Sequence, residues 1–294
     1  MRRLPYLLFD VFTDTPYEGN PLAVFPDAGD LDDVAMQRIA RELNLSESVF
    51  LTRGEGAYAA SLRIFTPVQE MLFAGHPTVG ASIAMTGALG WIPTTVDAFV
   101  LREGIGDVPI RIERGDGPPL AWLRTPPIAF GPPLPRDAAA RAVGLTEAEL
   151  HPAFEPRNIG AGNPFFFVAL RDPKAVDRAR LVETAMREIV DFDEANGLFV
   201  FAPVERGAYS RMFAPMSGIV EDPATGSATG PLGAYMVRAG ILPLVDGTAF
   251  ASEQGVAMGR RSILHGRLEV RDGALRTVEI GGNAVLVGEG TLVL

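Results

Sequence analysis

Glu47 has the side-chain type and the setting that proton transfer needs. It lies in NLSESVFL, at the head of a strand-like run. Positions 47, 49 and 51 share one face of a strand, so its carboxyl would lie beside Val49 and Leu51. Desolvation of that kind favours the neutral acid and raises the pKa towards the range useful for general acid–base catalysis. The alternative is an exposed carboxylate at a strand start.

His76 is one of only three histidines and lies in FAGHPTVGAS, at what reads as a helix start. The helix dipole disfavours an imidazolium there, so a neutral ring would donate one hydrogen bond and accept another. The other histidines, His151 and His265, are far away in sequence, and the chain has no cysteine. The usual ligands of a protein-built metal centre are therefore lacking, and we expect no metal. His76 remains either a positioning group or a residue that starts a helix.

Two glycine-containing loops precede small-residue, apolar helices: AGHPT (74–78) and TGSAT (225–229). The first amides of a helix lack internal partners, and glycine lets a ligand approach them. Two such helix starts across a cleft would hold a small carboxylate. We assign Gly75, Gly226 and Ser227 to substrate binding, together with Ser46 beside Glu47. The alternative is a pair of ordinary helix starts, with Pro77 at the first helical position and Ser227 capping its own helix.

The second loop also carries carboxylates, in EDPATGS (221–227). A carboxylate beside a helix start interacts favourably with its amides. Asp222 could orient His76 or a substrate amine if the two loops converge. The alternative is a turn formed by Asp222 and Pro223.

Most of the chain reads as short strands interrupted by few helices. Expected helices cover 31–44, with Asp30 as a possible N-cap, then a buried helix from Pro77, helical signals at 146–150 and 176–190, and a second small-residue helix at 227–240. Expected strands cover 6–12, 22–25, 48–52, 58–65, 97–103, 108–114, 120–125, 164–170, 197–203 and 209–215, with strand-like sequence from 263 to the end.

Three segments recur in the same order in both halves. GNPLAVF (19–25) matches GNPFFFV (162–168), RIFTP (63–67) matches RMFAP (211–215), and AGHPTVGASIAM (74–85) matches TGSATGPLGAYM (225–236). Matches in register indicate a duplicated fold. We predict an α+β protein of two pseudo-symmetric lobes, 1–126 and 127–294, each a curved, largely antiparallel sheet around a buried central helix. The last strands could pack back on the first lobe.

Composition excludes several classes of function. With 26 basic and 36 acidic residues, a net charge of −10 gives no basic surface for nucleic acid or an anionic membrane. The chain has no apolar run of membrane-spanning length, and its N-terminus reads as a strand rather than a signal peptide. The glycine loops lack the spacings of nucleotide-binding motifs. We expect a cytoplasmic protein with a small-molecule partner.

Four blocks together resemble the phenazine-biosynthesis isomerase family, the PhzF-like proteins: DVFTDTPYEGNPLAVF, MQRIARELNLSESVFL, RIFTPVQEMLFAGHPTVGAS and SRMFAPMSGIVEDPATGSATGPL. They extend from residue 10 to 232. The resemblance implies the diaminopimelate epimerase-like fold, which agrees with the internal repeat. It also implies a homodimer without metal or organic cofactor.

The phenazine enzymes of this family act on trans-2,3-dihydro-3-hydroxyanthranilic acid and move a hydrogen around its ring. The resemblance assigns acid–base chemistry to Glu47 and supporting roles to His76, Asp222 and Ser227, with the amides of Gly75 and Gly226 against the substrate. Related racemases use two cysteines, which this chain lacks. We therefore expect a single-base isomerase of a small carboxylated cyclic amino or hydroxy acid. Two alternatives stay open: an epimerase or lyase on another such acid, and a non-catalytic protein that binds aromatic carboxylates.

Overall fold

The computed structural model describes residues 2–189 and 197–294. Contacts between Cα atoms divide the chain into two compact units. Unit 1 comprises Met1–Arg124 and Gly281–Leu294, and unit 2 comprises Thr125–Ile280. The end of the helical signal predicted for 176–190 lies outside the described residues.

The sheet of unit 1 is mixed, with mainly antiparallel pairs. Its strands are β1 (Arg3–Val11), β2 (Asn20–Phe25), β3 (Glu47–Arg53), β4 (Tyr58–Phe65), β5 (Glu70–Met71), β6 (Ala98–Glu103), β7 (Gly106–Glu113), β8 (Leu120–Arg124) and β18 (Ala284–Val293). Strand β1 pairs antiparallel with β18 and β2. The order continues with β2 parallel to β3, β3 antiparallel to β4, β4 parallel to β6, and β6, β7 and β8 antiparallel in turn. Short β5 pairs antiparallel with β4.

Two helices cover opposite faces of this sheet. Helix α1 (Asp33–Leu43) packs on a core of Phe25, Phe50 and Phe65. Its N-cap is Asp32, not the predicted Asp30, because the Asp32 carboxylate accepts from the Ala35 N–H at 2.8 Å. Helix α2 (Gly75–Thr86) is buried along nearly its whole length.

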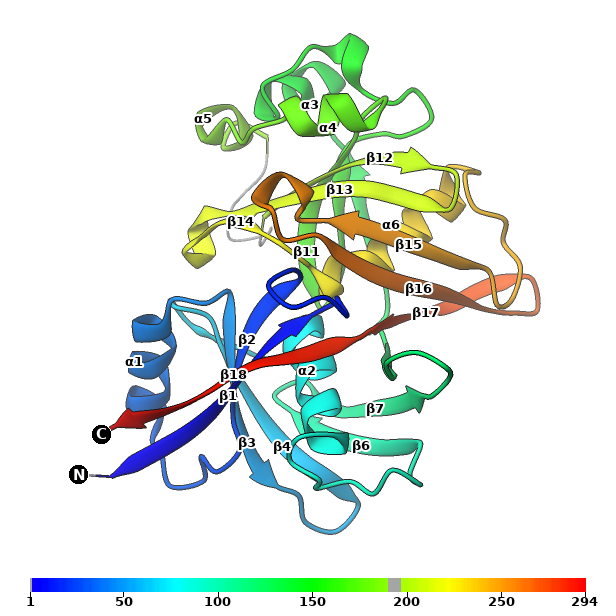
Figure 1. The fold of residues 1–294 in the computed structure, drawn as a ribbon. Coiled ribbons are helices and arrows are strands. Elements are labelled where there is room, and N and C mark those ends of the chain that lie inside the picture. The colour runs from blue at the N-terminus through cyan, green and yellow to red at the C-terminus, as the bar shows by residue number, and fades with distance from the viewer. Residues whose placement is uncertain (1, 190–196) are drawn as a thin grey trace. The chain divides into compact units, whose positions relative to one another are not determined.

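Helix α2 contacts β1, β2, β3, β8 and β18 (Figure 1). Strands from both ends of the sheet therefore meet the same helix, which requires the sheet to curve around it. A Cβ at Gly80 would lie 2.5 Å from the Leu22 side chain and 2.8 Å from Val11. The glycine is needed for this close approach of helix and sheet.

Unit 2 repeats this strand order. Its strands are β9 (Ala129–Pro133), β10 (Arg157–Ala161), β11 (Asn163–Ala169), β12 (Leu198–Val204), β13 (Gly207–Ala214), β14 (Ile219–Asp222), β15 (Ala249–Gln254) and β16 (Ser262–Arg271), and β17 (Ala274–Gly282) follows. Strand β10 pairs antiparallel with β9 and β11, β11 is parallel to β12, and β12 is antiparallel to β13. Strand β13 is antiparallel to β14 and parallel to β15, which is antiparallel to β16.

The helices of unit 2 also cover two faces. They are α3 (Arg136–Ala142), α4 (Pro173–Arg178), α5 (Glu183–Met186) and α6 (Gly226–Arg238), with 3-10 turns at Glu147–Glu149, Pro215–Ser217 and Val256–Met258. Side chains of α3, α4 and α5 pack with Phe166, Leu198 and Phe213. On the other face, Tyr235 of α6 contacts the rings of Phe154, Phe167 and Phe201.

The three repeated segments occupy equivalent places in the two units. GNPLAVF and GNPFFFV form β2 and β11, RIFTP and RMFAP end β4 and β13, and the small-residue segments form α2 and α6. The predicted α+β class, with a curved and mainly antiparallel sheet around a central helix, is confirmed. Among the described residues, no helix is long and apolar enough to cross a membrane.

Candidate active site

Glu47 begins β3, where the chain enters the sheet from α1. Helix α1 stops because Asn44 adopts the left-handed conformation, with φ 52°, and its N–H donates to the Ala40 carbonyl. Strand β3 then pairs parallel with β2, with Leu22 opposite Glu47. The Glu47 side chain is only 15% exposed. The alternative of an exposed carboxylate is therefore wrong.

His76 is the second residue of α2 and its side chain is 3% exposed. The helix begins at Gly75, two residues before the predicted start. Pro77 is consequently the third helical residue and not the first, which is tolerated because amides throughout the first turn lack intrahelical acceptors. The N-cap, Ala74, offers no side-chain cap.

Glu47 and His76, 29 positions apart in sequence, are in direct contact. Glu47 Oε2 lies 2.8 Å from His76 Nδ1. A carboxylate oxygen accepts, so Nδ1 carries the hydrogen and donates. His76 Nε2 is buried and has no hydrogen-bond partner among the described residues. The ring therefore holds the carboxylate with one nitrogen and keeps the other for a further partner.

Asp222 ends β14 in unit 2 and is 4% exposed. The Thr225 hydroxyl donates to its carboxylate at 2.6 Å. The neighbouring Glu221 instead accepts two hydrogen bonds from Arg211, at 2.8 and 2.9 Å. Of the two carboxylates in EDPATGS, only Asp222 lies buried beside the start of α6.

Helix α6 begins at Gly226, with Thr225 as its N-cap. Ser227 is the second helical residue and 8% exposed, so its predicted capping alternative is wrong. Ser46 lies in the bend directly before Glu47 and is half-buried. Binding roles for Ser46, Gly75, Gly226 and Ser227 stay predictions.

Sequence reasoning did not single out Gln254, which organises the loop before α6. Its Nε2 donates to the Asp222 carbonyl at 2.8 Å and to Thr225 Oγ1 at 2.9 Å, and its Oε1 accepts from the Thr225 N–H at 3.3 Å. Gln254 is fully buried at the end of β15. A signal existed in the sequence: AFASEQ (249–254) lies after the second small-residue helix where AFVLRE (98–103) lies after the first.

The other two histidines stay without an assigned role. His151 Nδ1 accepts from the Ala153 N–H at 3.2 Å, and burial lowers the pKa of the ring, with Arg136 and Arg171 adding to the effect. Among the described residues, no group of three or more histidine, aspartate or glutamate side chains gathers as a metal site would require.

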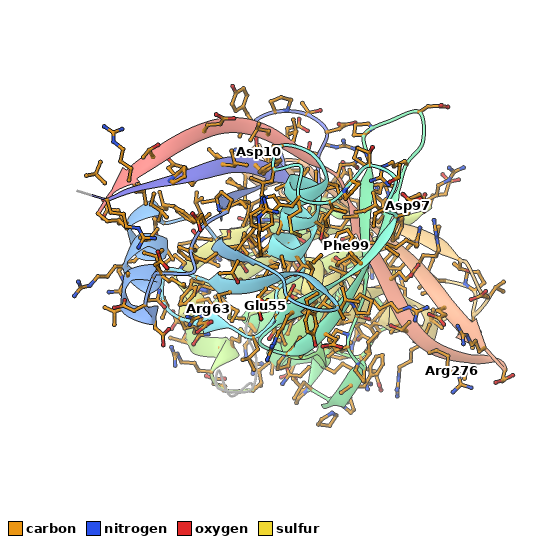
Figure 2. All side chains as sticks on the ribbon, turned by 90° about the horizontal axis from the view of Figure 1, so that it is seen from below. Asp10, Glu55, Arg63, Asp97, Phe99 and Arg276 are labelled. Atoms are coloured by element: carbon orange, nitrogen blue, oxygen red, sulfur yellow. The ribbon has the colours of Figure 1, made fainter. Side chains whose placement is uncertain are left out.

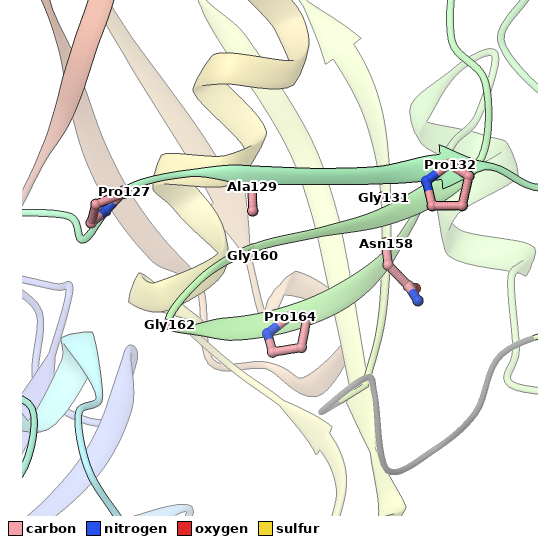
Figure 3. Close-up of a pocket in the computed structure, with 8 residues that line it drawn as sticks. All are labelled: Pro127, Ala129, Gly131, Pro132, Asn158, Gly160, Gly162 and Pro164. Carbon is pink, nitrogen blue, oxygen red and sulfur yellow. The ribbon is translucent and has the colours of Figure 1, made fainter.

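A cavity of about 380 Å³ lies on β9, β10 and β11 of unit 2 (Figure 3). Its lining residues are small, apart from one amide: Pro127, Ala129, Gly131, Pro132, Asn158, Gly160, Gly162 and Pro164. None of them can exchange a proton near neutral pH. The candidate catalytic residues Glu47, His76 and Asp222 are not among the residues that line this cavity.

Comparison with known proteins identifies a family of isomerases. A family model described as phenazine biosynthesis-like protein, PhzC-PhzF, matches residues 9–290. The chain belongs to this family, as its four sequence blocks predict.

Individual relatives extend the match over nearly the whole chain. The trans-2,3-dihydro-3-hydroxyanthranilate isomerase of Pseudomonas fluorescens is 38% identical over 293 residues, covering 98% of this chain and 99% of that protein. A predicted epimerase from Pseudomonas aeruginosa has a TM-score of 0.83 at 32% identity, covering 99% of each chain. A PhzF-family protein from Bacillus anthracis has a TM-score of 0.88 at 24% identity over all of both chains, which supports the fold. The predicted epimerase-like fold is confirmed, and the chain is an enzyme of the isomerase class.

Proposed function

We propose that this chain is a cofactor-independent isomerase that moves a proton between two carbons of a small cyclic carboxylic acid, with Glu47 as both base and acid. The observation that carries the proposal is the Glu47–His76 pair, at 2.8 Å, with His76 Nε2 lacking a partner among the described residues. A carboxylate held in one orientation can meet the same face of a substrate twice.

The proton balance of this reaction closes without a co-reactant. Glu47 Oε2 is engaged by His76, so Oε1 is the oxygen that takes a proton from one carbon. The resulting carboxylic acid returns that proton to another carbon of the same molecule while the double bonds shift between them. Substrate and product have the same composition, and Glu47 ends in its starting state. Efficient transfer in both directions requires a group that can change protonation near the working pH.

The relatives and the helix starts support a proposal for the substrate class. We propose a ring that carries a carboxylate and an amine, as in the substrate named for the Pseudomonas fluorescens relative. The first amides of α2, including that of Gly75, lack intrahelical acceptors and suit a carboxylate. In unit 2, Gly226, Ser227 and Asp222 are proposed to bind substrate, with Asp222 as the partner of its amine. A cytoplasmic homodimer remains our expectation for the assembly.

The test is turnover of trans-2,3-dihydro-3-hydroxyanthranilate, followed by loss of its diene absorbance. We expect activity from the wild-type chain and a drop in kcat of about 10²–10⁴-fold in Glu47→Gln, which keeps the shape but cannot exchange the proton. Glu70→Gln is the matched control, because Glu70 is another unit 1 carboxylate and bonds to Arg63. Full activity in Glu47→Gln would remove Glu47 from the mechanism.

The same assay separates the alternatives. Deuterium uptake from heavy water at a substrate α-carbon, without movement of the double bonds, would identify an epimerase or lyase instead. That outcome has some support, because one 32% identical structure is described as a predicted epimerase. Micromolar binding of 3-hydroxyanthranilate without exchange or product, retained in Glu47→Gln, would identify a binding protein.

A further inference from the structure

Glu103 is a buried carboxyl that the proposed reaction does not use. It ends β6 and is 5% exposed. Its Oε1 lies 2.7 Å from Thr78 Oγ1, and its Oε2 is buried without a hydrogen-bond partner among the described residues. Burial raises the pKa of this carboxyl to about 8, and the weaker opposing effect of Thr78 does not reverse that.

The hydrogen bonds of Thr78 show which form of Glu103 fits. Thr78 Oγ1 also lies 2.8 Å from the Ala74 carbonyl oxygen, which can only accept. A hydroxyl has one hydrogen, so Thr78 cannot donate both to Ala74 and to an ionised Glu103. A protonated Glu103 resolves this, because it donates to Thr78 Oγ1 while Thr78 donates to Ala74. Both short contacts of Thr78 Oγ1, to Glu103 and to Ala74, are then hydrogen bonds.

Within residues 2–189 and 197–294, no opposite charge compensates an ionised Glu103. The charged neighbours on its own strand and on β7 are Arg102 and Asp107, and both are exposed. They interact with Tyr58 instead: Arg102 lies over its ring and the Tyr58 hydroxyl donates to Asp107. From α2, Thr78 is the polar group that faces Glu103, and His76 lies in the same first turn bonded to Glu47. Burial accounts for the raised pKa of Glu103, and the Thr78 hydrogen bond opposes it.

The equivalent position in unit 2 carries a neutral amide. Strand β4 pairs Ser61 with Arg102, and β13 pairs Tyr209 with Glu253. Ser61 and Tyr209 lie two residues before the matched arginines of RIFTP and RMFAP, so the next residues, Glu103 and Gln254, are equivalent.

Both equivalent side chains reach the start of the central helix of their own unit. Glu103 contacts Thr78 in the first turn of α2, and Gln254 contacts the α6 N-cap, Thr225. The two first turns are built alike, because Thr229 donates to the Thr225 carbonyl at 3.0 Å as Thr78 does to Ala74. In unit 2 the role is filled by a side chain that never ionises.

We propose that Glu103 is a positioning residue that works as a neutral carboxylic acid: it donates to Thr78 and so fixes the first turn of α2, which presents Gly75 and His76. Its structural part is independent of the reaction. Its kinetic part rests on the proposed function, since it acts through the orientation of His76 on Glu47.

Two variants test whether Glu103 acts through a hydrogen bond of its neutral form or only by filling space. Glu103→Gln is the neutral isostere that unit 2 already uses, and Glu103→Met removes the hydrogen bond at similar volume. The folded-state pKa is raised above that of the unfolded chain. Stability from the neutral acid is therefore complete below about pH 4.5 and is lost as the pH rises through about 8. We expect the difference in Tm between Glu103→Gln and wild type to increase in favour of the variant from pH 5 to 8. Above pH 8 this difference should stay constant.

Two further readouts report on positioning. With only three histidines, the His76 ring signals can be assigned in NMR spectra by substituting His151 and His265. We expect these signals to shift with an inflection near pH 8 in wild type and to show none in Glu103→Gln. In the turnover assay at pH 6.5, Glu103→Met should lose about tenfold or more in kcat, with KM less affected, and Glu103→Gln should restore it.

If the difference in Tm between wild type and Glu103→Gln is constant from pH 5 to 8, the proposal that Glu103 works as a neutral carboxylic acid is wrong. Equal kcat in Glu103→Gln and Glu103→Met would overturn the positioning role. If no substrate is turned over at all, the proposed function fails, while the Tm and NMR readouts still decide the case for Glu103.

Discussion

The two units share a strand order and a buried central helix, yet they carry different polar groups at a few equivalent positions. Strand register fixes the equivalences. Strand β3 pairs Ser48 with Phe65, and β12 pairs Leu198 with Phe213, so the preceding residues Glu47 and Gly197 match. One unit therefore has a carboxylate at the strand start where the other has no side chain.

The other differences lie in the loops before the central helices and at the helix starts. His76 and Ser227 are each the second residue of their helix. Met71 pairs with Ile64 in unit 1, and Asp222 pairs with Met212 at the same place in unit 2. Glutamate and histidine thus belong to one unit and the buried aspartate to the other. In the proposed function the two units therefore have different chemical tasks.

Equivalent positions that carry the same residue type in both units have a structural role. Arg63 bonds to Glu70 with two hydrogen bonds of 2.7 Å in unit 1, and Arg211 bonds to Glu221 in the same way in unit 2. Arg63 lies beside α1, where it also bonds to Asp33 (Figure 2). An ion pair present in both units cannot explain their chemical difference. Glu221 is therefore structural, although it adjoins Asp222.

The largest expected effect is on the free energy of unfolding and concerns the ion pair of Arg211 with Glu221. The Arg211 side chain is 12% exposed and also donates to three backbone carbonyls near α4, whereas Arg63 is 35% exposed. Removing one partner of a buried pair leaves the other charge without compensation. We expect Arg211→Met to lower the free energy of unfolding by about 3 kcal/mol and Arg63→Met by at most about 1 kcal/mol. Urea unfolding measures both, and equal losses would show that burial does not distinguish the two pairs.

The next effect tests the division of chemical tasks. Asp222→Asn keeps the hydrogen bond from Thr225 but removes the charge proposed to meet a substrate amine. We expect kcat/KM to fall by about 10–100-fold, since a hydrogen bond between the substrate amine and a charged group contributes about 1.5–3 kcal/mol. The Tm should change little, because the asparagine still accepts from Thr225. Met71→Leu at the equivalent position should keep kcat/KM within about twofold. Unchanged kcat/KM in Asp222→Asn would confine the chemistry to unit 1.

Much of this arrangement was predictable from the sequence because the repeats preserve local patterns. GNPLAVF and GNPFFFV alternate between two buried faces, and small residues on every side of 77–86 indicate a helix enclosed by other elements. The same reasoning placed Glu47 at a strand start and His76 at a helix start. Their direct contact was not predicted, because it depends on the parallel pairing of β2 with β3 and on the curvature of the sheet around α2.

The parts that sequence reasoning missed have weak local signals. Helix α3 is a short alanine-rich run after a proline-rich stretch, and β9 contains glycine and two prolines, which usually argue against a strand. Glu103 and Gln254 look like ordinary strand ends. What distinguishes them is their long-range hydrogen bonding to the start of a helix 25 or 29 positions earlier in the chain.

A last expected effect concerns Gly197, the unit 2 position equivalent to Glu47, which carries no carboxylate. A Cβ at Gly197 would lie 2.5 Å from the Phe213 carbonyl oxygen and 3.2 Å from the Ala214 Cβ, so backbone would have to move to admit any side chain. We expect Gly197→Ala to lower the free energy of unfolding by about 1–3 kcal/mol, as overpacking does. Gly115→Ala is the matched control, because nothing lies within 4 Å of a Cβ there. A Gly197→Ala protein as stable as that control would mean that sterics do not forbid a carboxylate at this position. The restriction of the proposed proton shuttle to unit 1 would then need a chemical reason rather than a packing one.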